Sequence, residues 1–182
     1  MGADAAGSAG ELLERDHRRI DEGFARFAES LSGPAVDRAA FHDAALALRH
    51  HIYIEEVHHF PTVKATGLMA PVLVMLREHG EIWDLLDALG DVLGNENGND
   101  SDNGTSNDRG NDDDNAAARG LWQQLATVLD EHNVKEERIV YPAGDEKLPP
   151  EAAATIATAL AMGETPPGWT CQMAGRRAQG AP

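Results

Sequence analysis

The stretch that decides the fold is His51-Ile52-Tyr53-Ile54-Glu55-Glu56, followed by Phe60-Pro61, because the chain uses it twice. The second copy reads His132-Asn133-Val134-Lys135-Glu136-Glu137 and is followed by Tyr141-Pro142, at a constant offset of 81 residues. Side chains four residues apart lie on one face of a helix, so each copy predicts a His and a Glu that project together. The aromatic-Pro pair predicts the end of each helix.

Two further histidines complete the repeat. Asp16-His17-Arg18-Arg19-Ile20 and Glu78-His79-Gly80-Glu81-Ile82 share the pattern acidic-His-x-x-Ile, and each precedes one copy of the His-x-x-x-Glu phrase. The predicted repeat unit is therefore a helix with one His followed by a helix with His-x-x-x-Glu.

Length, composition and charge narrow the class of protein. The 182 residues, of which 42% are hydrophobic, indicate one soluble globular domain. A net charge of −16 argues against binding to nucleic acid or to an anionic membrane. Cys171 is the single cysteine, so an internal disulfide and a thiolate-based zinc or iron-sulfur site are excluded. The sequence has neither a basic-apolar leader nor an apolar run of about 20 residues, and we expect a cytoplasmic protein.

Apolar residues recur at steps of three and four in four stretches of the chain. These steps predict helices over residues 9–31, 35–58, 68–93 and 116–140. Four long helices with apolar seams predict an all-α fold, an up-down-up-down four-helix bundle whose halves are related by a pseudo-two-fold axis.

The remaining segments lie between and after these helices. Residues 95–115 hold seven acids and one Arg but no apolar residue, which predicts a disordered acidic insertion between the third and fourth helices. Residues 151–162 predict a short helix. The tail from residue 163, with Cys171, is expected to be extended or disordered. The bundle is thus assigned to residues 9–142 and a C-terminal extension to residues 143–182.

Six polar residues occupy seam positions at which a leucine is expected, so they face the bundle interior. Burying them without partners would cost several kcal/mol per group. They could satisfy one another by hydrogen bonds, but metal ions suit the set better, because imidazole and carboxylate ligands favour iron, manganese or zinc. Two irons can share the electrons that dioxygen or peroxide chemistry requires, whereas zinc has no redox chemistry. The six are His17, His51, Glu55, His79, His132 and Glu136.

These residues resemble the haemerythrin-like, or HHE cation-binding, domain family over roughly residues 10–142. The family pattern is a His on the first helix, His-x-x-x-Glu with an aromatic-Pro close on the second, a His on the third, and His-x-x-x-Glu with the same close on the fourth. The resemblance implies a four-helix bundle with two iron ions, a non-haem di-iron centre bridged by the two glutamates and by an oxo or hydroxo group. Carried over residue by residue, it implies the same six residues as metal ligands.

The oxygen-carrying members differ from this chain. They have His-x-x-x-His on the third helix and an Asp five residues after the His of the fourth, whereas here Trp83 lies four residues after His79 and the carboxylate is Glu136. Four His and two Glu look more like the bacterial haemerythrin-like proteins and the di-iron iron-sulfur-repair proteins linked to nitric oxide and oxidative stress. The resemblance therefore does not favour simple oxygen storage.

Several neighbouring residues are expected to play lesser parts. Glu56 and Glu137 lie about 100° round the helix from the ligand face, which favours a role behind the ligands or on the surface. His58 and His59 suggest a solvated helix end more than a proton relay, and His42 and His50 are expected on the surface. Trp83 could cover the site or pack in the core.

The expected function is a cytoplasmic di-iron protein that binds or reduces dioxygen, nitric oxide or peroxide, with peroxide disproportionation as a candidate enzymatic activity. Two alternatives stay open. One is a di-iron enzyme that oxidises an organic substrate with dioxygen. The other is a module that senses iron, oxygen or redox state for a protein partner.

Overall fold

The computed structural model describes residues 7–33, 35–94 and 108–175, and the regular elements in these ranges are all helical. The predicted all-α class is therefore confirmed. No helix in the described ranges is long and apolar enough to cross a membrane. With η marking a π-helix, the elements are α1 (Ala9–Ser30), α2 (Arg38–Ile54), η1 (Glu55–His59), α3 (Phe60–Ala65), α4 (Met69–Gly94), α5 (Asp108–Lys135), η3 (Glu136–Val140), α6 (Tyr141–Asp145) and α7 (Pro150–Met162).

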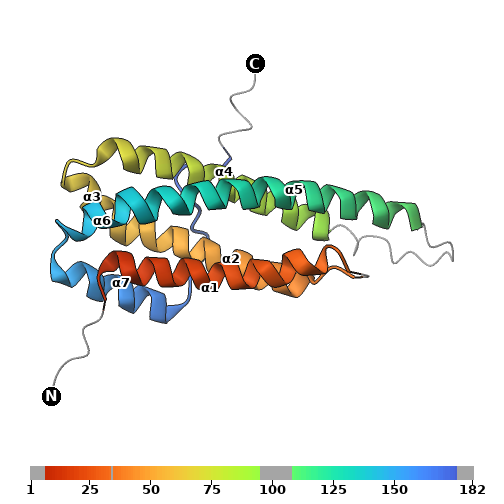
Figure 1. Ribbon diagram of the computed structural model, residues 1–182, viewed down its shortest axis with the longest axis horizontal. Helices are drawn as coiled ribbons and strands as arrows, with labels where there is room; N and C mark the ends of the chain where they lie inside the picture. Colours follow the sequence, from red (N-terminus) through yellow and green to blue (C-terminus); the bar gives the residue numbers. More distant parts are fainter. Residues whose placement is uncertain (1–6, 34, 95–107, 176–182) are drawn as a thin grey trace.

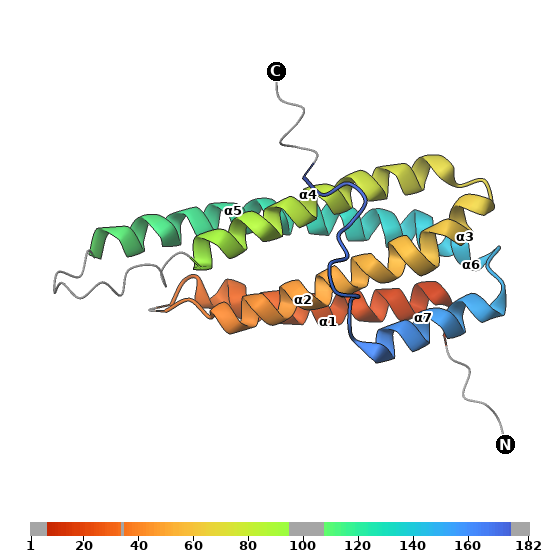
Figure 2. The same cartoon turned by 180° about the vertical axis from the view of Figure 1, so that it is seen from behind.

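Four long helices, α1, α2, α4 and α5, lie side by side along the length of the molecule (Figure 1). The sequence colours show that the chain direction reverses from each long helix to the next. Helix α1 packs most closely against α2, and α4 packs most closely against α5. The view from behind shows α7 beside α1 and α2 at one end and the segment after α7 crossing α2 and α4 (Figure 2).

Local hydrogen bonds fix where the first two helices begin. The Ser8 hydroxyl accepts from the Glu11 amide at 3.2 Å, and the Glu11 carboxylate accepts from the Ser8 amide at 3.0 Å, which forms a capping box. Asp145 of α6 accepts from the Ser8 hydroxyl at 2.6 Å and from the Gly10 amide at 3.0 Å. The start of α1 is thus tied to α6, and the Asp37 side chain caps α2.

The buried apolar side chains form two clusters at different levels of the bundle. One contains Phe24 and Phe27 of α1 with Leu86 and Leu89 of α4. The other lies toward the α7 end and includes Leu13, Ile54, Phe60, Val72 and Ile156. On α1, His17 stands between Leu13 and Ile20, which belong to different clusters. Along the bundle axis, apolar side chains therefore fill the interior both before and after the position of His17.

The aromatic-Pro pairs do not end their helices, so the predicted boundaries at Phe60-Pro61 and Tyr141-Pro142 are wrong. Each helix widens into one π-turn, in which the Phe60 amide donates to the Glu55 carbonyl and the Tyr141 amide donates to the Glu136 carbonyl. Each proline then falls in the first turn of α3 or α6, where a helix needs no amide donor at that position. The widened turns begin at the two predicted ligand glutamates.

The C-terminal part also differs from the sequence-based prediction. Residues 163–175 pack on the bundle, and Cys171 is 4% exposed, because the chain folds back over α2 and α4 after α7. Helix α7 likewise buries His50, whose Nε2 lies 3.1 Å from the Ala159 carbonyl oxygen. The predicted short helix is present as α7, while residues 176–182 lie outside the described ranges.

The acidic insertion was predicted over residues 95–115, but α5 begins at Asp108. The second part of this stretch is therefore helical. The first part, residues 95–107, lies outside the described residues.

Candidate metal centre

The six residues singled out from the sequence converge on one interior point of the bundle. They come from six elements, and none is more than 3% exposed. The elements supply one residue each, namely His17 from α1, His51 from α2, Glu55 from η1, His79 from α4, His132 from α5 and Glu136 from η3.

The two carboxylates lie between two pairs of imidazoles, His17 with His51 and His79 with His132. Glu55 Oε2 is 3.5 Å from Nε2 of His51 and 3.2 Å from Nε2 of His79. The Glu136 carboxylate spans the pairs with its two oxygens, since Oε2 is 3.4 Å from Nε2 of His17 and Oε1 is 3.2 Å from Nε2 of His132. Each carboxylate therefore contacts one histidine of each pair, as a ligand that bridges two metal ions must.

The ligand atoms form two overlapping groups. One consists of Glu55, His79, His132 and Glu136, and the other of His17, His51 and Glu136, with the atoms of each group within 4.8 Å of one another. Glu136 belongs to both. The geometry can thus hold two metal ions that share a carboxylate.

Three of these ligand atoms have no hydrogen-bond partner although they are buried. They are Oε2 of Glu55, Nε2 of His79 and Oε1 of Glu136. Buried polar atoms without partners destabilise a fold, and here they point into one shared space. Nitrogen and carboxylate oxygen are ligands that iron, manganese and zinc accept, so the residues present fit two such ions.

A second ring of carboxylates holds the outer nitrogens of the four histidines. Each Nδ1 lies 3.0 Å from a carboxylate oxygen, and because an ionised carboxylate only accepts, each Nδ1 carries the proton. This arrangement turns every Nε2 inward and makes the imidazole a stronger metal ligand once that nitrogen has lost its proton. The pairs are His17 with Glu137, His51 with Asp16, His79 with Glu56, and His132 with Glu78.

The sequence pattern did not predict half of this outer ring. The prediction placed Glu56 and Glu137 off the ligand face, and they bond histidines of other helices. Asp16 and Glu78 belong to the acidic-His pattern, but that pattern predicts no role for them. The available signal was that both copies of the pattern keep an acid directly before the histidine.

Electrostatics favours positive charge at the centre. Burial lowers the pKa of His51, but the charge of Glu55 and the hydrogen bond to Asp16 outweigh it and raise that pKa to about 10. His132 behaves alike, and its pKa rises to about 10 beside Glu136 and Glu78. Burial and the charge of Glu55 raise the pKa of Glu136, but His132 and His17 hold it at about 2. Without metal, protons supply the positive charge that the two glutamates require.

Tyr141 is a centre residue that the sequence reasoning used only as a helix-closing aromatic. Its hydroxyl oxygen lies 2.7 Å from Glu55 Oε1 and 3.1 Å from Glu136 Oε2. The same oxygen lies 3.2 Å from Nε2 of His17 and 3.5 Å from Nε2 of His51. The equivalent residue of the first copy is Phe60, which stacks on His79 and has no hydroxyl. This single oxygen makes the two halves chemically unequal, and the Phe/Tyr difference between the copies was its signal.

Two other predicted positions are also resolved. His59 is fully buried with neither ring nitrogen bonded, so the solvated helix end expected there is wrong. Its ring packs against Tyr141, and burial lowers its pKa. Trp83 packs against Trp169 and under Arg49, 4.6 Å from the guanidinium carbon to the ring centroid, so it is a core residue.

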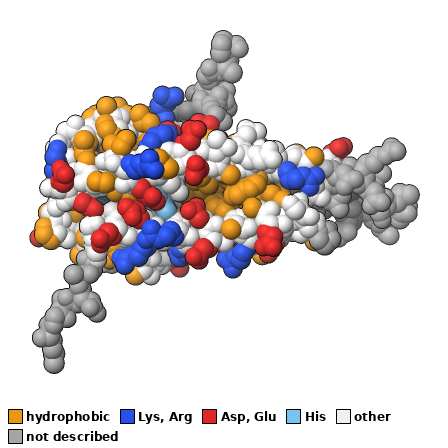
Figure 3. Space-filling view, in the orientation of Figure 1, with side chains coloured by type: hydrophobic (Ala, Val, Ile, Leu, Met, Phe, Trp, Pro, Cys, Tyr) orange, Lys and Arg blue, Asp and Glu red, His pale blue; other side chains and the backbone are white. Residues whose placement is uncertain are grey.

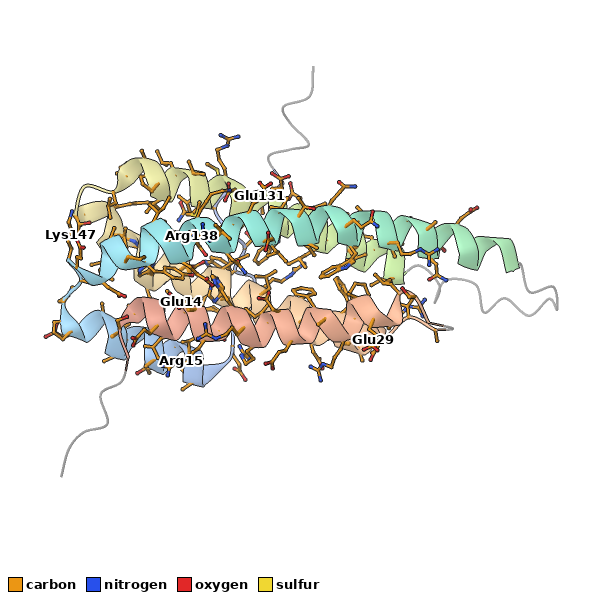
Figure 4. All side chains as sticks on the ribbon, viewed as in Figure 1. Glu14, Arg15, Glu29, Glu131, Arg138 and Lys147 are labelled. Atoms are coloured by element: carbon orange, nitrogen blue, oxygen red, sulfur yellow. The ribbon has the colours of Figure 1, made fainter. Side chains whose placement is uncertain are left out.

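On the face formed by α1 and α5, acidic and basic side chains are intermingled and little histidine surface is visible (Figure 3). Side chains of both helices fill the space between their ribbons (Figure 4). The centre is therefore enclosed by protein on this side, which agrees with the 3% exposure of His17.

A helical bundle that buries four imidazoles around two carboxylates, with carboxylates behind every imidazole, defines a His/carboxylate cation-binding protein. The sequence model of the Hemerythrin HHE cation binding domain matches residues 8–144, and the chain belongs to this family. Searches of curated proteins and of solved structures returned no match.

Proposed function

We propose that the chain is a non-haem di-iron protein that binds or reduces a small oxidant, namely dioxygen, nitric oxide or peroxide, in defence against oxidative or nitrosative stress. The observation that carries the proposal is the pair of overlapping ligand groups that share Glu136. The fold it assumes is the up-down-up-down bundle with the acidic insertion between α4 and α5. Its proposed setting is the cytoplasm.

The donor set accepts iron, and the reduction of an oxidant favours iron over zinc, which has no redox chemistry. The set contains nitrogen and carboxylate oxygen but no thiolate, since the only cysteine, Cys171, belongs to the segment after α7. Two iron ions in these positions would supply the electrons that reduction of a small oxidant requires. His17 and His51 would hold one ion and His79 and His132 the other, with Glu55 and Glu136 between them.

The protein residues have three tasks in this proposal. The two apolar clusters exclude water from the centre, which strengthens every electrostatic interaction within it. The outer carboxylates hold each Nδ1 proton and aim each Nε2 inward, where a metal ion would replace the proton that His51 and His132 carry without metal. Tyr141 holds a proton on its hydroxyl oxygen beside both glutamates, 3.2 Å from Nε2 of His17 and 3.5 Å from Nε2 of His51.

Six protein ligands for two ions leave room for a small molecule. A seventh ligand could come from the third helix four residues after His79, but Trp83 stands there and packs in the apolar core. The enclosed centre favours a diatomic molecule or peroxide over a larger organic substrate.

The test is anaerobic loading with Fe(II) followed by titration with dioxygen, nitric oxide and peroxide in separate experiments. We expect oxidation of two irons per chain by dioxygen or peroxide, or a stoichiometric nitric oxide complex, with a new visible absorption band. The variants His51→Ala and His132→Ala should each lose one ion and the band. A loaded wild-type protein that reacts with none of the three oxidants would overturn the proposal, and product formation from an organic metabolite would support the alternative enzyme.

A further inference from the structure

The segment after α7, residues 163–175, crosses the bundle (Figure 2) and is called here the C-terminal strap. It lies beyond the 8–144 range of the family match. Trp169 anchors it edge-on to Tyr53 of α2 and Trp83 of α4, with ring centroids 5.2 Å and 5.6 Å apart. Further along, Met173 lies against Gly80, where an added Cβ would come within 2.6 Å of the Met173 carbonyl oxygen. The strap is thus packed closely onto the helix that carries His79.

One hydrogen bond links the strap to the metal centre. The backbone amide of Gln172 donates to Glu56 Oε2 at 2.9 Å, and the other oxygen of the same carboxylate accepts from Nδ1 of His79 at 3.0 Å. Both oxygens of Glu56 are therefore bonded by protein groups. A chain of contacts runs from the strap backbone through Glu56 to a candidate metal ligand.

The internal duplication supplies a comparison within the same molecule. Glu137 is the counterpart of Glu56 in the second copy, and it bonds Nδ1 of His17 at the same 3.0 Å. The strap covers only one of the two. The Glu56 side chain is 1% exposed, whereas that of Glu137 is 37% exposed.

Burial changes what such a carboxylate does. Water competes for the oxygens of an exposed carboxylate. A buried carboxylate with both oxygens bonded makes a stronger charged hydrogen bond to the imidazole. It also has less conformational freedom to lose when it makes that bond. The other two outer carboxylates bond to a cation, Arg19 for Asp16 and Lys135 for Glu78. For Glu56 the strap amide takes that place.

We propose that the C-terminal strap is a positioning element for the metal centre: the Gln172 amide holds Glu56, Glu56 orients His79, and the strap thereby slows loss of the ion held by His79 and His132. The inference rests on the proposed metal centre, and it adds that the strap controls how fast one of the two ions is lost. A partner or a modification that lifts the strap would loosen one of the two ions and leave the other in place.

The experiment compares release of iron from the loaded full-length chain into an excess of chelator. Gln172 is the second residue of a turn closed by the Ala174 amide on the Cys171 carbonyl, a position that proline favours. Gln172→Pro therefore removes the amide donor while keeping the turn, and Gln172→Ala is the matched control that retains the donor. Trp169→Ala removes the anchor of the strap and keeps both partners of the hydrogen bond, so it weakens that bond only by freeing the strap. Circular dichroism establishes that each variant is folded.

Removing a group behind a metal ligand typically costs 10- to 100-fold in metal affinity. We expect Gln172→Pro and Trp169→Ala to release one iron equivalent about tenfold faster than the wild type. The second equivalent should leave at the wild-type rate, and Gln172→Ala should match the wild type throughout.

Wild-type release rates in both Gln172→Pro and Trp169→Ala would overturn the inference, and so would equal acceleration by Gln172→Ala and Gln172→Pro. These failures are distinct from failure of the proposed function. If the proposed function were wrong, the wild-type chain would bind no iron, or would bind iron that no oxidant attacks.

Discussion

Replacement of Tyr141 by phenylalanine removes one buried oxygen that touches both glutamates of the centre. The hydroxyl has a single hydrogen, and its shortest contact, 2.7 Å, is with Glu55. Burial and the charges of Glu136 and Glu55 raise the pKa of Tyr141 well above its usual value, so the group stays protonated and donates at neutral pH. In the metal-free protein Tyr141→Phe therefore deletes a hydrogen bond to a buried carboxylate.

The magnitude follows from the type of bond. A hydrogen bond to a charged group contributes about 1.5–3 kcal/mol, and the ring itself is retained. We expect the free energy of unfolding of the metal-free variant to fall by about 2–3 kcal/mol. At about 2–4 °C per kcal/mol for a chain of this size, Tm should fall by about 4–12 °C. The phenyl ring of Phe60 at the equivalent place shows that this position after a π-turn accepts phenylalanine.

The assay is thermal and urea unfolding of the metal-free proteins, with Tyr53→Phe as the control. Tyr53 contacts Trp169 and His50 and lies outside the centre, so its loss should change stability by no more than about 0.5 kcal/mol. In the iron-loaded protein, Tyr141→Phe should also alter the visible absorption. Equal, small effects of the two substitutions would refute the reasoning.

The remaining predictions concern the protons of the centre, the buried cysteine and the apolar core. His51 and His132 have pKa values of about 10 without metal, so each is protonated at pH 7. Iron uptake should therefore release protons, and the apparent affinity for iron should rise with pH. Calorimetry in buffers of different ionisation enthalpy would measure the number of protons released. Burial raises the pKa of Cys171 from 9.0 to about 11, so the thiol should react slowly with alkylating reagents at pH 8 until the protein unfolds. The proton that the folded state retains makes stability fall as pH rises between about 9 and 11, and Cys171→Ser should weaken that fall. Phe27→Ala, fully buried away from the centre, should cost about 3–5 kcal/mol while leaving the iron content of the folded protein unchanged.

The duplicated phrase was informative because helix periodicity is a local property. Spacing by four residues placed His51 with Glu55 and His132 with Glu136, and the apolar seams placed them inside, so the convergence of all six residues could be predicted. Local periodicity carries no information on how one helix is rotated against another. The partners of the four Nδ1 atoms, which cross between helices, could therefore not be derived.

The helix boundaries show a second limit. Proline after an aromatic residue signals a helix end in an ordinary α-helix, but one widened turn moves the proline into the first turn of a new helix. Nothing in the residue types distinguishes the two outcomes. The C-terminal strap was missed for a related reason: its residues have no helical or strand period, and their order comes from tertiary contacts such as those of Trp169.

The most direct test of the account is the iron content of the anaerobically reconstituted chain and of two neighbouring variants. Glu136 belongs to both ligand groups, whereas Glu137 bonds only the outer nitrogen of His17. The account predicts two irons per wild-type chain, fewer than one in Glu136→Ala, and two, more weakly held, in Glu137→Ala. No bound iron in the wild type, or equal iron in the wild type and Glu136→Ala, would contradict it.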